Sequence, residues 1–475
     1  MKETYELAII GAGSAGFAAA SVASKAAIRV ALIDEAEKLG GLCILKGCMP
    51  SKTFIESSNR FWEIQQAKNY GLNVGNLSAD MLRIQKRKRT LVEEFAQGRE
   101  EEILSLPIDF IRGRASFISP HELVIKQKGG KERLISSKTF VIATGSVIDP
   151  LPIPGLAQTG FLTSDSALEL ERLPGSLTIL GGGAVGCEFA QFFSRLGCKT
   201  TIIQRSPRLV KSFDPEVSEC LREAFLSEGI GVFSDTQIEA VTKENGYKKV
   251  SFLYKGKKTE VFSEEIFYAL GRKPNVEKIG LEKIGIDIQV QPLSLNDKMQ
   301  TALPHIFVAG DASGNYGIVH IAREEGEIAA KNALEILAGK PPSNVVCRRL
   351  TMEVVFTDPQ VAMVGLWPSN RKALCAKYFF KDHGKAIIEG KEKGFVKICA
   401  DPSSAEILFG TIIGPHASEL IHQLSTCIYY RGTVEDLLKM PFYHPTLSEI
   451  LSYPAEEIFS RLKEKKEKTH PATTR

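Results

Sequence analysis

Two stretches of the chain share one pattern, in which a run of strand-forming residues is followed by a glycine turn, an apolar helix and a second strand. The first stretch reads YELAII, GAGSAG, FAAASVASKAA and RVALID, and it ends at Asp34. The second reads SLTIL, GGGAVG, CEFAQFFSRLG and KTTIIQR. Units of this kind build dinucleotide-binding folds. The repeat therefore predicts an α/β chain with two Rossmann-like domains.

Proline-rich and glycine-rich segments separate these units from the rest of the chain. VIDPLPIPG follows the strand TFVIATGS, and YALGRKPN closes the second unit, so both are predicted crossovers. The strand HIFVAGDAS and a long helical pattern come next, ending at Pro341 and Pro342. The remaining segment of about 130 residues places strands before helices, an α+β order. We predict a first domain over 1–148, a second over 149–272, a central segment over 273–344 that completes the first, and a last domain over 345–475 with a charged tail.

Composition narrows the class of protein. The 475 residues are 43% hydrophobic and 24% charged, and the net charge is only +4. Dispersed charge of this size gives little support to nucleic-acid binding. No apolar run approaches the roughly 18 residues of a membrane span, and the N-terminus lacks the pattern of a secretory signal. Nine cysteines in such a chain do not suggest a structural disulfide framework. We expect a cytoplasmic, reducing setting, where closely spaced cysteines are catalytic or bind metal.

The two glycine turns differ in the residue that follows them. In the first turn, Gly11, Gly13 and Gly16 allow a tight turn and close approach to a pyrophosphate, and Asp34 can accept hydrogen bonds from a ribose. The second turn contains Gly181, Gly183 and Gly186. It has no acid at the matching position, where the sequence instead places Gln204, Arg205, Arg208 and Lys211. Guanidinium groups bind a 2′-phosphate, so the sequence favours NADP over NAD.

Two cysteines lie five residues apart in GGLCILKGCMPSK. On a regular helix, Cys43 and Cys48 would be separated by about 7.5 Å of rise, too far for a disulfide. Gly47 is the kind of residue that allows the helix to distort. A metal-binding pair would be spaced more closely and matched by a second pair, which the sequence lacks. We therefore interpret Cys43 and Cys48 as a redox pair, with no metal.

A histidine lies close to the C-terminal end, in FYHPTLSEIL. His444 precedes Pro445, and Thr446 with Glu449 spells a capping box at a helix start. Glu449 could serve as a cap alone. A histidine held before a capped helix beside a carboxylate also suits a general base that handles a thiol proton.

These motifs together resemble the class I pyridine nucleotide–disulfide oxidoreductases, in the order GAGSAG, GGLCILKGCMPSK, VIATGS, GGGAVG, YALGRKPN, FVAGD and HPTLSE. The resemblance implies FAD on the first domain with Asp311 on its ribityl chain. It implies that Cys43 exchanges with substrate while Cys48 faces the flavin, and that Lys52 pairs with Glu188. It also implies a homodimer, formed by the last domain, in which His444 and Glu449 serve the partner's active site. The remaining positions expected to bind the cofactors are Gly41, Thr144, Gly145, Gly271, Arg272 and Gly310.

The choice of substrate within the family depends on a few positions. Glutathione reductases generally have PKK where this chain has PSK, and an arginine at the position of Val22. Mercuric reductases end in a vicinal cysteine pair, which is missing, although VVFTDPQVAMVG is similar to one of their segments. The best resemblance is to dihydrolipoamide dehydrogenase, which implies a small dithiol substrate and membership of a 2-oxo acid dehydrogenase complex as one option.

Two departures from that enzyme stand out, namely Ile44-Leu45-Lys46 between the cysteines and the basic residues after Gln204. A cation beside a thiolate lowers its pKa, so we predict an acidic thiol if Lys46 points inward. Two other interpretations stay open. One is the same scaffold acting on another electrophile, as in glutathione-reductase-like or mercuric-reductase-like enzymes. The other is a flavin-bound interaction protein without turnover.

Overall fold

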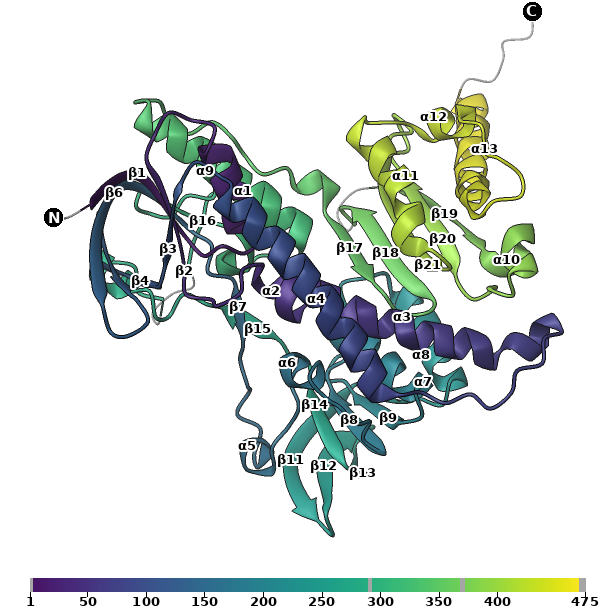
Figure 1. The fold of residues 1–475 in the computed structure, drawn as a ribbon. Coiled ribbons are helices and arrows are strands. Elements are labelled where there is room, and N and C mark those ends of the chain that lie inside the picture. The colour runs from purple at the N-terminus through teal and green to yellow at the C-terminus, as the bar shows by residue number, and fades with distance from the viewer. Residues whose placement is uncertain (1–2, 289–292, 368–371, 470–475) are drawn as a thin grey trace, which may run out of the picture.

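The structure is a computed structural model, and it describes residues 3–288, 293–367 and 372–469. Three lobes are visible in Figure 1: a purple and blue lobe that holds the N-terminus, a teal lobe below it, and a yellow-green lobe at the upper right. Each lobe has its own main sheet. The predicted α/β fold with two Rossmann-like units and a C-terminal α+β unit is confirmed.

The first lobe is built on a seven-stranded sheet. Its strands are β1 (Glu3–Ile10), β2 (Val30–Asp34), β3 (Asp109–Arg112), β4 (Arg114–Ser119), β5 (Glu122–Lys126), β6 (Glu132–Ile142) and β16 (Ile306–Val308). Their order is β3-β2-β1-β6-β5-β4, with β16 beside β6. The strands β1, β2, β3, β6 and β16 run parallel, and the β4-β5-β6 meander is antiparallel. Residues 7–10 of β1 and 30–33 of β2 are buried on both faces of the sheet, which is why these stretches are continuously apolar.

The helices of this lobe come from distant parts of the chain. They are α1 (Ser14–Ala23), α2 (Gly41–Lys46), α3 (Cys48–Gln65), α4 (Met81–Leu104) and α9 (Val319–Leu337), with short turns η1 (Ala67–Tyr70), η2 (Leu281–Ile284) and η3 (Gly310–Ser313). α9 lies on α1 so closely that a Cβ at Gly326 would meet the Ala15 carbonyl oxygen at 2.1 Å. Together, β16 and α9 return the chain to the first lobe after the second has been completed.

The second lobe repeats the parallel arrangement on a smaller scale. Its main sheet has the order β10-β9-β8-β14, and an antiparallel meander β11-β12-β13 lies beside it. The strands are β8 (Ser176–Leu180), β9 (Lys199–Ile203), β10 (Gly231–Phe233), β11 (Thr236–Glu244), β12 (Tyr247–Tyr254), β13 (Lys257–Ser263) and β14 (Glu265–Tyr268). The helices are α5 (Leu156–Thr159), α6 (Ser164–Ala167), α7 (Ala184–Arg195) and α8 (Pro215–Ser227). The two crossovers pair with one another as β7 (Ser146–Ile148) and β15 (Arg272–Pro274).

The third lobe has a five-stranded antiparallel sheet in the order β17-β18-β21-β20-β19. Its elements are η4 (Arg348–Leu350), β17 (Met352–Val355), β18 (Gln360–Gly365), β19 (Leu374–Phe379), η5 (Phe380–Asp382), α10 (Gly384–Ile388), β20 (Phe395–Ala400), β21 (Ile407–Gly414), α11 (Ala417–Tyr429), α12 (Val434–Lys439), η6 (Leu447–Leu451) and α13 (Ser452–Thr469). One face of this sheet packs under the helices α11 and α13, and the other joins the core of the second lobe.

A disulfide joins Cys375 and Cys399, which face each other on β19 and β20. The cysteine count did not suggest a structural disulfide framework, and this single disulfide was not predicted from the sequence. The partners are 24 residues apart in sequence, and their register depends on strand pairing, which the cysteine spacing does not reveal.

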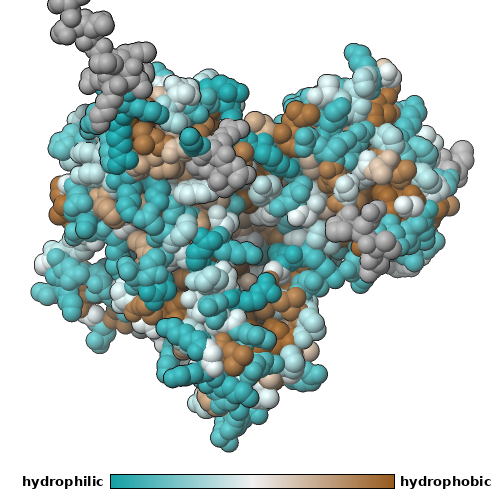
Figure 2. Space-filling model, turned by 180° about the vertical axis from the view of Figure 1, so that it is seen from behind, coloured by the Kyte–Doolittle hydropathy of each residue, from teal (hydrophilic) through white to brown (hydrophobic). Residues whose placement is uncertain are grey.

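The predicted charged tail begins within the last helix. α13 continues as far as Thr469, so the charged residues from Lys463 onward begin inside a helix, and residues 470–475 lie outside the described residues. Within the described part of the chain, no helix is both long and apolar enough to cross a membrane. Viewed from behind, the surface is mostly hydrophilic with separate apolar patches on the lobes (Figure 2).

Candidate functional site

The first glycine turn is held tightly between β1 and α1. Gly11 has a φ of 104°, and a Cβ there would meet the carbonyl oxygen of Ala143 at 2.3 Å. Asp34, at the end of β2, accepts hydrogen bonds from the Ala12 N–H at 2.7 Å and from the Ala36 N–H at 2.8 Å. The carboxylate thus fixes the turn and lies where a ribose would be bound.

A cavity of about 410 Å³ is bordered by this turn and by Cys43. Gly13, Gly40 and Cys43 are among its lining residues, together with side chains of α4 and α9. Gly41 packs against Gly13, where a Cβ would come within 2.6 Å of the Gly13 Cα. At the end of β6, the buried hydroxyl of Thr144 has no hydrogen-bond partner among the described residues. The glycine backbone in the cavity wall and, separately, the unpaired buried hydroxyl at the end of β6 fit a nucleotide cofactor, and FAD is the one that the resemblance implies.

Asp311 lies at the other end of the same region. One oxygen of its carboxylate accepts a hydrogen bond from the Ser146 hydroxyl at 2.6 Å. Arg272 donates to the same hydroxyl at 2.9 Å and to the Ser146 carbonyl at 2.8 Å. Gly145 and Gly310, which flank these residues, both have positive φ, as does Gly271. The two crossover strands therefore hold Asp311 next to Thr144 and Gly145.

The predicted redox pair sits on two helices rather than one. α2 ends at Lys46 and α3 begins at Cys48, with Gly47 between them at φ −127° and ψ −114°. This break lets the chain fold back, because a Cβ at Gly47 would meet the Leu42 carbonyl oxygen at 2.9 Å. Both thiols are free in the structure and hydrogen-bonded to each other. The break supplies the distortion that a regular helix lacks.

A buried ion pair lies one turn further along α3. Lys52 donates to Glu188 at 2.7 Å, and the Glu188 side chain is only 5% exposed. The other oxygen of Glu188 accepts the Phe356 N–H at 2.9 Å, and the Lys52 ammonium lies 4.7 Å from the centre of the Phe356 ring. This cluster joins α3, α7 and the end of β17, so all three lobes meet beside the cysteines.

The two thiols differ in acidity. The pKa of Cys48 is lowered to about 7, first by its hydrogen bond with Cys43 and then by the charge of Lys52. Desolvation and the Glu188 charge oppose this shift. The pKa of Cys43 is raised by its hydrogen bond with Cys48 and by burial. Cys48 is therefore the cysteine that carries the thiolate above pH 7.

Lys46 takes no part in this effect. Its side chain is 61% exposed and forms an ion pair with Asp165 at 3.4 Å, on α6 of the second lobe. The condition for a Lys46 effect on the thiol, an inward-pointing side chain, is not met. The acidic thiol owes its charge stabilisation to Lys52.

The second glycine turn repeats the geometry of the first with an amide in place of the acid. Gln204 accepts the Gly182 N–H at 3.0 Å and donates to the Arg208 carbonyl at 3.2 Å. An amide carries no charge that would repel a phosphate. Arg205 and Lys211 are exposed, Arg208 is half-buried, and no ion pair involving them is found within the described residues.

His444 and Glu449 lie on the third lobe, between α12 and α13. His444 contacts Glu449 through Nδ1 at 3.0 Å, and its side chain is 82% exposed. The second oxygen of Glu449 accepts the Thr446 N–H at 2.8 Å. This bond and the one to His444 lower the pKa of Glu449 despite some desolvation. Glu449 thus both caps η6 and orients His444.

Three residues that the sequence reasoning did not single out belong to this region. Ser146 connects Asp311 with Arg272, Phe356 covers Lys52, and Asp165 holds Lys46. Ser146 directly follows Thr-Gly, and that adjacency was a usable signal. Phe356 and Asp165 are brought in only by tertiary folding.

Most of the chain matches two known families. Residues 5–326 match the pyridine nucleotide-disulphide oxidoreductase family, and residues 351–455 match its dimerisation domain. The chain belongs to this family of FAD-dependent disulfide oxidoreductases. The family uses FAD and NAD(P), and the matching dimerisation domain supports a homodimer.

Relatives of the chain carry one shared name. It is 34% identical to a dihydrolipoyl dehydrogenase of Chlamydia pneumoniae over 459 residues, which cover 95% of this chain and 96% of the relative. It is 33% identical to one of Bacillus subtilis, with 94% and 96% covered. Among solved structures, LpdA from Mycobacterium tuberculosis aligns with a TM-score of 0.85 and 26% identity, covering 95% and 99%. The flavoprotein disulfide reductase RclA from Escherichia coli shares the fold with a TM-score of 0.82, 24% identity and the same coverage.

Proposed function

We propose that this chain exchanges an electron pair between NADP(H) and a small dithiol of the dihydrolipoamide type, through the pair Cys43 and Cys48. The observation that carries the proposal is the asymmetry of the thiols, with the pKa of Cys48 lowered to about 7 beside Lys52 and that of Cys43 raised. FAD, when bound, relays the electron pair between the nicotinamide and the cysteines. Asp34, Thr144, Gly145 and Asp311 are the residues proposed to hold it.

The proposed thiol–disulfide exchange uses only the cysteines, Lys52 and the histidine as reacting or stabilising groups of the protein. A substrate thiolate attacks the Cys43 sulfur of the oxidised pair, forming a mixed disulfide and releasing Cys48 as a thiolate that Lys52 stabilises. The second substrate thiol then attacks the mixed disulfide, leaving a cyclic substrate disulfide and two reduced cysteines. His444 of a partner chain, oriented by Glu449, would accept the proton of the first substrate thiol, and the proton of the second would remain on the released Cys43 thiol.

The proposal also specifies the nucleotide, NADP(H) rather than NAD(H). Gln204 leaves the ribose position without a negative charge, and Arg205, Arg208 and Lys211 supply positive charge after β9. An acid at this position would repel a 2′-phosphate. Dihydrolipoamide is favoured as substrate because the relatives carry the name dihydrolipoyl dehydrogenase. On the same ground we propose a lipoyl-bearing 2-oxo acid dehydrogenase complex as the physiological partner.

The deciding experiment is steady-state kinetics of the purified, FAD-loaded enzyme. We expect kcat/KM for NADPH-dependent lipoamide reduction to exceed the value for oxidised glutathione, and the value with NADPH to exceed that with NADH. A matched Cys48→Ser variant should bind FAD but lose lipoamide turnover. Turnover that persists in Cys48→Ser would contradict the thiol mechanism, and a clear NADH preference would contradict only the nucleotide assignment.

A further inference from the structure

The loop between β9 and α8, residues 204–214, holds the three basic side chains proposed to meet a 2′-phosphate. Its start is fixed within the second lobe, because Gln204 bonds the glycine turn and the Val210 N–H donates to the Gly182 carbonyl at 2.8 Å. The end of the loop is instead held by the third lobe. Ser212 donates to Glu353 of β17 at 3.0 Å, so the third lobe reaches the loop directly.

Asp214 is the main point of contact between this loop and the third lobe. One oxygen of its carboxylate accepts the Glu216 N–H at 2.8 Å and caps α8, and the other accepts from Lys397 of β20 at 2.7 Å. The Asp214 and Lys397 side chains are 2% and 13% exposed, so this is a buried pair. Burial alone would lower the pKa of Lys397, but the bonds to Asp214 and Glu216 raise it, which keeps the ammonium charged.

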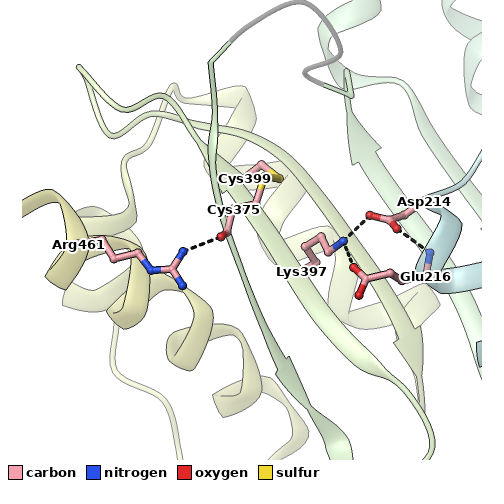
Figure 3. The surroundings of a disulfide bond; sticks show 6 residues. All are labelled: Asp214, Glu216, Cys375, Lys397, Cys399 and Arg461. Carbon is pink, nitrogen blue, oxygen red and sulfur yellow. Dashed lines mark hydrogen bonds and ion pairs between the residues drawn. A yellow bond between two sulfur atoms is a disulfide. The ribbon is translucent and has the colours of Figure 1, made fainter.

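The sheet presents a second lysine to the same helix start. Lys377 faces Lys397 directly across β19 and β20, and both ammonium groups bind Glu216. Two opposed like charges would destabilise a strand pair, and these are neutralised by the acids of α8. The Cys375–Cys399 disulfide links the same two strands two residues away, on the same face (Figure 3).

We propose that the third lobe acts as a brace for nucleotide binding, in which Lys397 is a positioning residue that holds the loop of Arg205, Arg208 and Lys211 through Asp214. This role deepens the proposed function and depends on the 2′-phosphate assignment for its ligand. The ligand class is a dinucleotide with a 2′-phosphate on its adenosine ribose. Because Lys397 holds the end of the loop at Asp214, removing it releases that end, next to Lys211, without removing any basic side chain.

The test measures binding of NADP⁺ and NAD⁺ to the oxidised, FAD-loaded enzyme by calorimetry, without turnover. Lys397→Met should weaken NADP⁺ binding about fivefold and NAD⁺ binding by less than about twofold. Asp214→Asn keeps the helix cap and removes the charge, so it should show the same selective loss in a chain that still folds. The double variant should lose no more than the stronger single variant, because both changes break one pair.

Two further variants separate the brace from a general effect on folding. Lys397→Arg keeps the charge, so its affinity for NADP⁺ should stay within about twofold of the wild-type value. Lys393 also bridges the lobes, by donating to Ser227 at 2.7 Å, but it lies at the far end of α8, so Lys393→Met should change neither affinity. Unchanged NADP⁺ affinity in both Lys397→Met and Asp214→Asn, or an equal loss for NAD⁺, would overturn the brace. A wild type that prefers NAD⁺ would overturn the nucleotide assignment instead, whichever way the variants behave.

Discussion

At the scale of single residues, the chemistry depends on which groups surround the Cys48 sulfur. The thiolate form prevails above its pKa of about 7 and is lost as the pH falls below that value. The hydrogen bond from Cys43 is the largest favourable influence and the charge of Lys52 is the next. We therefore expect Cys43→Ala to raise this pKa most and Lys52→Met to raise it less. The measurement is the rate of Cys48 alkylation by iodoacetamide in the reduced enzyme as a function of pH, with mass spectrometry identifying the modified residue.

Lys46→Met is the matched control, because it removes a cation only two residues from Cys48 in sequence. Its ammonium pairs with Asp165 and is exposed, so the pH midpoint should not move. A shift as large as that of Lys52→Met would show that Lys46 does reach the thiol. The sequence alone pointed to Lys46 as the cation beside the cysteines but could not give the direction of its side chain, because that direction depends on the helix break at Gly47.

At the scale of elements, the sequence predicted best where a local pattern specifies the structure. Both glycine turns follow their strands as expected, and each residue at the end of the second strand, Asp34 or Gln204, bonds back to its turn. Contacts between segments that are distant in the sequence could not be predicted from it. Phe356 packs on Lys52 although the two residues are 304 positions apart in the sequence. No periodicity in either segment indicates that contact.

The Cys375–Cys399 disulfide gives a prediction for the third lobe. It closes a loop of 24 residues between an edge strand and its neighbour, and closing such a loop stabilises the folded state by about 3 kcal/mol. In a Cys43→Ser/Cys48→Ser background, treatment with a phosphine reductant should lower the free energy of unfolding of this lobe by that amount. Thermal unfolding followed by circular dichroism, with and without reductant, measures the change.

The control for this experiment adds Cys375→Ser to the same background, which removes the disulfide in advance. The reductant should then leave the unfolding midpoint where it is. If the midpoint of the parent protein is also insensitive to reductant, the disulfide adds nothing to stability. If mass spectrometry of the untreated protein finds both cysteines reduced, the bond itself is absent.

At the scale of the whole molecule, the positions of the cysteines and of His444 indicate a site shared between two chains. His444 is 82% exposed and oriented by Glu449, and within the described residues it does not line the cavity beside Cys43 of its own chain. Large apolar side chains are exposed on the same lobe, with Tyr443, next to His444 in sequence, at 83% and Tyr430 at 76%. Exposed tyrosines of this density are typical of protein interfaces. A second copy of the chain would cover them and bring a histidine to each thiol pair.

Mixed dimers test this arrangement. Cys48→Ser and His444→Ala homodimers should both be nearly inactive, because each of their sites lacks one group. In a mixed dimer with a shared site, one site combines the intact cysteines of one chain with the intact histidine of the other, while the second site lacks both. After unfolding and refolding at equal ratio, half of the dimers are mixed, so activity should return to roughly a quarter of the wild-type value. If each site belonged to a single chain, every site in the mixture would lack one group, and no activity would return.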